Sequence, residues 1–122
     1  MSSQLSALLV SLAMEVPLAL VLALSLHWVV RADRGRLLVV AAGTTLLTHP
    51  VAWWTYRGLR RSLEWERWPA FALVEIGVTL AEAALYWRLA RITPVRALIL
   101  SLTVNAASAF WGGEVAVWLG LR

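Results

Sequence analysis

Residues 69–89 read PAFALVEIGVTLAEAALYWRL, an apolar run with two glutamates, Glu75 and Glu82, inside it. A helix of about 20 apolar residues crosses the roughly 30 Å of hydrocarbon in a bilayer, because each residue adds about 1.5 Å. Backbone groups in hydrocarbon must bond to one another, so a spanning run is a helix. The stretch therefore predicts a transmembrane helix that carries carboxyl groups.

Three further apolar runs of similar length cover residues 5–28, 37–54 and 97–119. The chain is 61% hydrophobic and only 15% charged, against a usual charged share of about 25%. None of the runs shows the continuous polar face that a helix of a soluble domain needs. We expect an all-α, four-transmembrane-helix bundle, a single integral domain over residues 1–122 that passes several times through the cell membrane.

The two halves of the chain resemble each other when one is shifted by sixty residues. This shift aligns Glu15 with Glu75, Arg31 with Arg91, Arg36 with Arg96, Thr45 with Asn105, and Thr48 with Ser108. We predict two tandem helical hairpins, residues 5–56 and 69–122, related by a pseudo-two-fold axis along the membrane normal, as parallel repeats are in some transporters. The link at 57–68 mixes charged and apolar residues and is expected to lie along the interface.

Polar residues inside the apolar runs are the candidate site. A carboxylate in hydrocarbon costs roughly 2.5–3.5 kcal/mol on insertion scales, so such residues indicate a function or a partner. Carboxylate and imidazole together suit zinc, manganese or iron, which makes Glu15, His49 and Glu75 possible ligands of a divalent metal ion. The surrounding polar cluster is expected to contain Glu82, Asn105, Thr45, Thr48 and Ser108.

Other uses of the same groups remain open. An oxygen shell suits sodium or calcium, and neighbouring carboxyls can carry protons because both do not ionise easily. Protonated carboxyls can also act as packing groups that hydrogen-bond across helices. No recognised metal-ligand spacing is present, and the chain has no cysteine. We expect Glu15, His49, Glu75, Glu82 and Asn105 to form one connected cluster.

The leading interpretation is a small transporter or ion-binding membrane protein that handles a cation or protons. The alternatives are a non-catalytic accessory subunit of a larger membrane complex, or an intramembrane enzyme with His49 and a glutamate as acid and base. No nucleophile motif supports an enzyme. The eleven basic residues, all arginine, are scattered over short loops, which argues against nucleic-acid binding. The lipid bilayer is the expected partner, with further copies or subunits possible.

Small residues predict where helices approach closely, because membrane helices pack through them. The expected contact residues are Ala41, Ala42, Gly43, Ala106 and Ala107.

Overall fold

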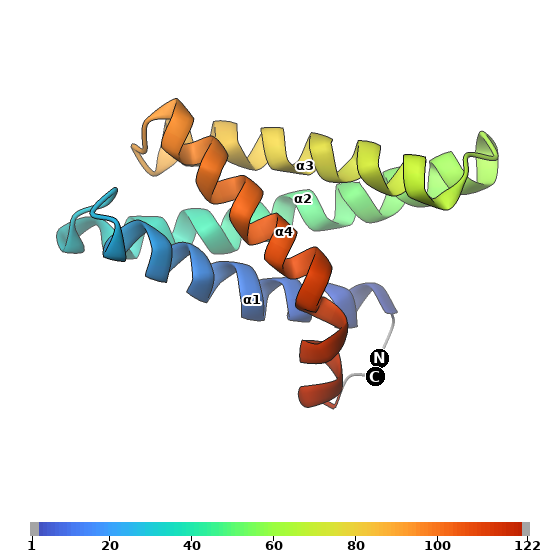
Figure 1. The fold of residues 1–122 in the computed structure, drawn as a ribbon, viewed down its shortest axis with the longest axis horizontal. Helices are drawn as coiled ribbons and strands as arrows, with labels where there is room; N and C mark the ends of the chain where they lie inside the picture. Colours follow the sequence, from blue (N-terminus) through green and yellow to red (C-terminus); the bar gives the residue numbers. More distant parts are fainter. Residues whose placement is uncertain (1–2, 121–122) are drawn as a thin grey trace.

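The computed structural model describes residues 3–120, and this part of the chain forms four long helices (Figure 1). They are α1 (Ser3–Ser25), α2 (Arg34–Ser62), α3 (Arg67–Leu89) and α4 (Pro94–Trp118), with a short 3-10 helix, η1 (Arg31–Asp33), before α2. All four long helices are long and apolar enough to cross a membrane. The predicted all-α class and the four helices of spanning length are therefore confirmed.

Each of the three connections reverses the chain through one non-glycine residue with positive φ. These residues are His27 (φ 55°), Glu64 (φ 54°) and Arg91 (φ 57°). A left-handed residue after a helix lets the next N–H groups bond back to the last turn. The N–H of Trp28 does so, donating to the carbonyl of Ala23 at 2.9 Å. The connections are therefore short, which makes sequential helices antiparallel neighbours.

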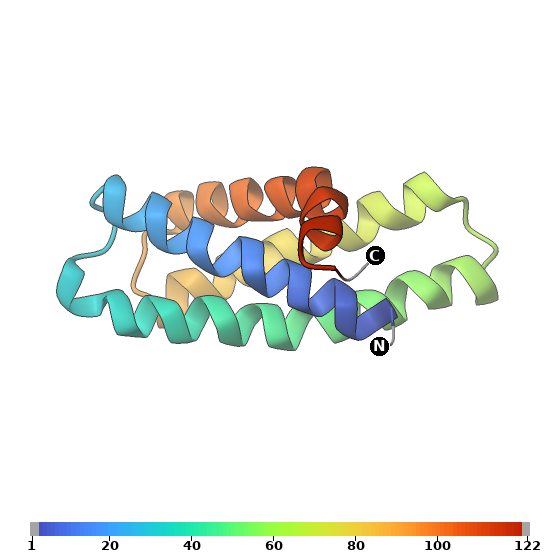
Figure 2. The same ribbon diagram turned by 90° about the horizontal axis from the view of Figure 1, so that it is seen from below.

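The helices are arranged as a ring in which α1 and α3 each pack against α2 and α4. Helices α1, α2 and α3 run nearly along one axis, whereas α4 crosses them obliquely (Figures 1 and 2). The start of α1, the end of α4 and the α2–α3 connection all lie toward one end of the bundle. The oblique path of α4 carries its last turns away from α2 and α3 and across α1, where Gly112 lies close to Val10.

Helix α2 is longer than the sequence suggested. It continues through Pro50 to Ser62, so the first half of the expected interfacial link extends the helix, and the connection covers only 63–66. Pro50 leaves the rest of the helix intact, because one proline removes only one bond, to the carbonyl four residues earlier. The guanidinium of Arg57 lies 5.5 Å from the Trp54 ring centroid. This cation–π contact stabilises the positive charge on the last part of α2.

Packing is densest at the opposite end, near the α1–α2 and α3–α4 connections. The large side chains of Leu37, Tyr86, Ile92 and Leu100 are almost completely buried there and belong to one cluster. This cluster closes the bundle at the end away from the α2–α3 connection.

Small residues with a four-residue spacing let the helices approach. Ala19 and Ala23 on α1 are fully buried, as are Ala97 and Ser101 on α4, and these two helices are neighbours. This is the small-xxx-small pattern of membrane helix contacts.

The contact residues predicted from sequence were only partly right. Ala41 is fully buried, whereas Ala42 and Ala107 are intermediate and Gly43 and Ala106 are exposed. The prediction was wrong for the two exposed residues because the buried face of a helix depends on its rotation, which composition does not determine.

The outer surface is apolar on all four helices. Val39 on α2, Trp68 on α3 and Phe110 on α4 are 70%, 71% and 85% exposed. Soluble monomers rarely expose contiguous apolar patches larger than a few hundred Å². This surface is the kind that a bundle presents to hydrocarbon.

The surface predicts how the protein fractionates. After carbonate washing of membranes that contain the protein, it should remain in the pellet, because four apolar spans hold it far more strongly than surface electrostatics do. Immunoblotting of pellet and supernatant measures this. Release into the supernatant would contradict a membrane-spanning bundle.

The small-residue contacts predict a packing effect. Ala23→Leu adds three carbons at a fully buried position and should lower the free energy of unfolding by about 1–3 kcal/mol through overpacking. Ala13→Leu, on an exposed part of the same helix, is the matched control. Thermal unfolding in detergent compares them, and equal midpoints for the two variants would contradict close packing at Ala23.

Candidate functional site

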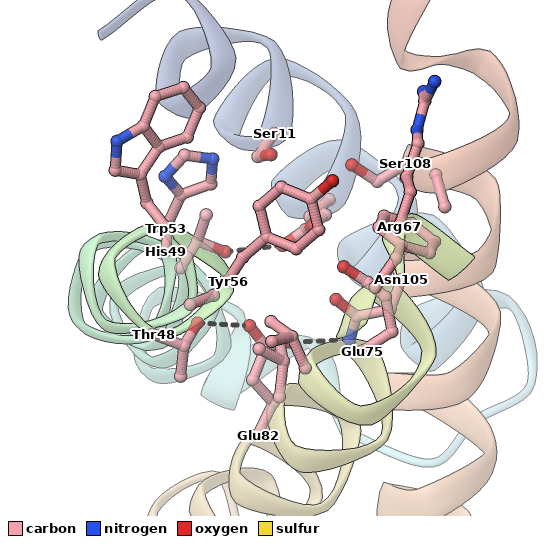
Figure 3. A pocket seen from close by; sticks show the side chains of 17 residues that line it. Ser11, Thr48, His49, Trp53, Tyr56, Arg67, Glu75, Glu82, Asn105 and Ser108 are labelled. Carbon is pink, nitrogen blue, oxygen red and sulfur yellow. Dashed lines mark hydrogen bonds between the residues drawn. The ribbon is translucent and has the colours of Figure 1, made fainter. Parts of the chain in front are cut away.

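A polar cavity of about 370 Å³ lies between the four helices (Figure 3). It extends toward the α2–α3 end, where Tyr56 and the exposed Arg67 contribute to its wall. All eight residues of the predicted site line this cavity: Glu15, Thr45, Thr48, His49, Glu75, Glu82, Asn105 and Ser108. The structure therefore brings together every polar residue that the sequence singled out, from all four helices.

Glu82 is the deepest of the acidic residues, with only 1% of its surface exposed. Its Oε1 accepts a hydrogen bond from the Thr48 hydroxyl at 2.7 Å, and its Oε2 accepts one from Asn105 Nδ2 at 2.8 Å. Asn105 Nδ2 also donates to the Ser101 carbonyl at 2.9 Å. The Ser101 hydroxyl in turn donates to the Thr79 carbonyl at 2.7 Å. Both oxygens of Glu82 are thus held by neutral donors from α2 and α4.

Glu15 is held differently. Its side chain is 5% exposed, and its Oε2 lies 2.8 Å from the Thr45 hydroxyl oxygen. The same hydroxyl lies 3.1 Å from the carbonyl oxygen of Ala41, so its single proton has two possible acceptors. Ser108 on α4 lines the same cavity.

Glu75 and His49 are the less constrained members of the site. Both are half-buried and line the cavity. Within residues 3–120 the structure gives the Glu75 carboxyl no hydrogen-bond donor, and His49 Nδ1 is buried without a partner. A buried polar atom without a partner costs free energy unless something binds it. Among the titratable residues of the predicted site, Glu75 and His49 are therefore the two whose side chains have no hydrogen bond to another described residue.

The five residues expected to form one connected cluster share the cavity but not one bonded network. Glu15 bonds to Thr45, and Glu82 bonds to Asn105 and Thr48. The hydrogen bonds among residues 3–120 form separate groups around Glu15 and around Glu82, and a single connected cluster of the five residues stays a prediction.

No preassembled metal centre is present in the described part of the chain. Among residues 3–120, no three His, Cys, Asp or Glu side chains are grouped closely enough to hold a metal ion. His49 and Glu75 lie on different sides of the cavity (Figure 3), and Glu15 lines it from α1. Their role as ligands of a divalent metal ion stays a prediction.

The predicted two-fold relation of the hairpins also stays a prediction. In a symmetric pair, the Glu15–Thr45 contact would be matched by a contact of Glu75 with Asn105. Asn105 bonds to Glu82 instead, and α4 diverges from the bundle where α2 does not. The hydrogen bonds therefore do not repeat between the two halves.

The sequence analysis missed the residues that widen the cavity toward its open end. They are Ser11, Trp53, Tyr56, Arg67 and Phe71. Three of them stand four residues from a predicted site residue and so share its helix face: Ser11 before Glu15, Trp53 after His49, and Phe71 before Glu75. Tyr56 and Arg67 were missed because they lie at or beyond the ends of the apolar runs.

Tyr86 forms part of the floor beneath Glu82. Its side chain is 1% exposed and packs in the same cluster as Leu37 and Leu100. The buried Thr44 hydroxyl donates to the Ala41 carbonyl of its own helix at 3.0 Å. The polar cavity thus ends at a layer of closely packed side chains.

The Thr48–Glu82 hydrogen bond predicts that replacing threonine by valine lowers stability more at Thr48 than at Thr103. Thr48→Val removes a donor to a buried carboxyl on another helix, and should lower the free energy of unfolding by about 1 kcal/mol. Thr103→Val is the control, since the exposed Thr103 donates only to the Ile99 carbonyl of its own helix. Unfolding in detergent measures both, and equal effects would contradict an inter-helix role for Thr48.

In comparisons with protein families, with curated proteins and with solved structures, none matches this chain. The functional argument therefore rests on the residues and geometry of the cavity itself.

Proposed function

We propose that this protein is a multi-pass membrane protein that binds a cation in its polar cavity and exchanges it for protons on its glutamates. The observation that carries the proposal is the convergence of Glu15, Glu75 and Glu82 on one cavity of about 370 Å³. Arg67, near the open end, is the one arginine among the lining residues. The cavity wall therefore offers more acidic than basic groups.

The electrostatics of a membrane interior favour such an exchange. A carboxylate removed from water is costly unless a proton or a counter-cation neutralises it. Three carboxyls around one cavity increase that cost, because each ionised group disfavours ionisation of the next. A bound cation lowers the cost of ionisation, so its entry releases protons, and rebinding of protons expels it.

Thr45 can hydrogen-bond to Glu15 in both protonation states of the carboxyl, which supports the uptake and release of a proton there. When Glu15 is ionised, the Thr45 hydroxyl donates to it at 2.8 Å. When Glu15 is protonated, the hydroxyl can turn its proton to the Ala41 carbonyl, 3.1 Å away, and accept the proton of the carboxyl. Both protonation states of Glu15 therefore keep a hydrogen bond without backbone movement.

Glu75 is the proposed first contact for the cation. Its carboxyl has no donor among the described residues, and Phe71 and Arg67, which precede it on α3, line the wider part of the cavity. Glu82 lies one to two turns deeper and already has both oxygens bonded. His49, with its unbonded Nδ1, is a further proton acceptor across the cavity.

Transport across the membrane would require the floor to open. The layer around Tyr86, Leu37 and Leu100 is almost completely buried and closes the end away from the α2–α3 connection. A cavity open at one end and closed at the other suits one of the two states of alternating access. The predicted hairpin duplication would provide the two halves that move.

The unbonded side chains of Glu75 and His49 favour a cation-binding protein over a non-catalytic accessory subunit. Polar residues kept for packing are hydrogen-bonded, as Glu82 is. Glu75 and His49 are not bonded in this way, and their position on the cavity wall is that of ligand-binding groups.

The proposal predicts proton release on cation binding. Ethylammonium or sodium chloride added to the purified, weakly buffered protein in detergent should release protons, measured with a pH electrode. Glu75→Gln should weaken the response at least about tenfold, the factor that a loss of 1.4 kcal/mol of attraction gives. Binding should also weaken as the pH falls, because protons compete for the same carboxyls.

Glu114→Gln is the matched control, since Glu114 is exposed on α4 and does not line the cavity. It should release protons as the parent protein does. If neither cation releases protons from the parent protein, the proposed function is contradicted. It is also contradicted if Glu75→Gln releases protons as the parent does.

A further inference from the structure

A second hollow adjoins the polar cavity on the side of α2 and α3. It is a groove of about 350 Å³ whose wall is apolar except for Thr48 and Thr55. Gly77 and Ala81 on α3 make the groove deep, because glycine has no side chain and alanine has only a methyl group. A Cβ added at Gly77 would meet no atom within 4 Å.

The groove faces outward at the level of the apolar spans. Leu47, Val51 and Leu73, which line it, are 63%, 62% and 48% exposed. All three lie inside helices that are long and apolar enough to span a membrane. In a bilayer the groove is therefore open to hydrocarbon, not to water.

The groove and the polar cavity are adjacent and share part of their walls. Thr48, Ala52, Val74 and Val78 line both hollows. Figure 3 shows Thr48 at this boundary with its hydroxyl directed to Glu82. A molecule lying across the boundary would have one part among apolar side chains and the other beside carboxyls.

We infer that the cation bound by this protein is an amphiphilic amine, which enters sideways from the bilayer between α2 and α3. Its ammonium group would lie beside Glu75 and Glu82, and its apolar chain in the α2–α3 groove. This inference rests on the proposed cation site and adds the class of ligand and the route.

Charge complementarity selects the amine. The cavity wall holds three carboxyls and one arginine, so a cationic head group is attracted where a carboxylate or phosphate head group is repelled. An ammonium group has three donors and no acceptor, which matches the donor-free Glu75 carboxyl. An alcohol head group would leave the carboxylate charge without a counter-charge.

A groove between α3 and α4 also reaches the cavity, but its wall includes Glu75 and Asn105. Those polar groups would lie against an apolar chain and lose their hydration without a new partner. The α2–α3 groove has no carboxyl or amide in its wall, and we therefore assign the chain to it.

The test uses the full-length protein in nanodiscs of neutral phosphatidylcholine and a dodecylamine with a diazirine at the end of its chain. Photolysis should give saturable labelling on the groove faces of α2 and α3, located by mass spectrometry. Unlabelled dodecylamine should compete, and dodecanol should not. Labelling confined to α4, spread over all lipid-facing surfaces, or equally displaced by dodecanol would overturn the inference.

Two alanines of α3 provide a matched pair of variants. Ala81→Phe fills the groove, whereas Ala84→Phe changes an equally exposed alanine that does not line it. Ala81→Phe should weaken the competition by dodecylamine at least about tenfold, the effect of excluding roughly two methylenes from an apolar site. Ala84→Phe should leave it unchanged. Gly77→Leu, at a position with open space, is the second groove-filling variant if Ala81→Phe does not fold.

Experiments with ethylammonium distinguish a failure of this inference from a failure of the proposed function. Because it has almost no chain, its proton release should be lost in Glu75→Gln but kept in Ala81→Phe. If Ala81→Phe and Gly77→Leu bind dodecylamine like the parent while Glu75→Gln still loses ethylammonium, the groove is refuted and the cation site stands. If the parent releases protons with sodium but with neither amine, this inference is refuted and the cation site stands. If it releases none with sodium, ethylammonium or dodecylamine, both are refuted.

Discussion

The structure depends on one constraint, that a carboxyl group buried among apolar helices needs hydrogen-bond donors from its neighbours. The two most deeply buried glutamates, Glu15 and Glu82, are on α1 and α3, and the donors that reach them are on α2 and α4. These donors are Thr45, Thr48 and Asn105. Because the helices form a ring in which α1 and α3 each contact α2 and α4, every acidic helix lies between two donor helices. This alternation fixes the order of packing as well as the rotation of each helix.

The number of helices and the membership of the site could be predicted from the sequence because both follow from composition along the chain. Apolar runs indicate spans, and polar residues inside them must find one another or a ligand. The end of α2 could not be predicted in this way, since its last residues are charged and continue the helix without adding to an apolar run.

The hydrogen-bond partners of the glutamates could not be predicted from the sequence either. Glu75 and Glu82 are seven residues apart and share one face of α3, so periodicity alone does not say which of them meets Asn105. The crossing of α4 decides it, because it places Asn105 beside Glu82 and leaves Glu75 without a donor. A crossing direction results from the sizes of all side chains at the contact, including the fully buried Ala97 and Ser101.

The pairing of acids and donors within each half of the chain has a consequence for biogenesis. Glu15 and Thr45 belong to the α1–α2 hairpin, and Glu82 and Asn105 belong to the α3–α4 hairpin. The first hairpin can therefore leave the translocation machinery with its carboxyl already bonded, before the second has been synthesised. The second can follow in the same way, after which only the Thr48–Glu82 bond remains to join them. Neither Glu15 nor Glu82 has to wait in lipid for the other hairpin before it gains a hydrogen-bond donor.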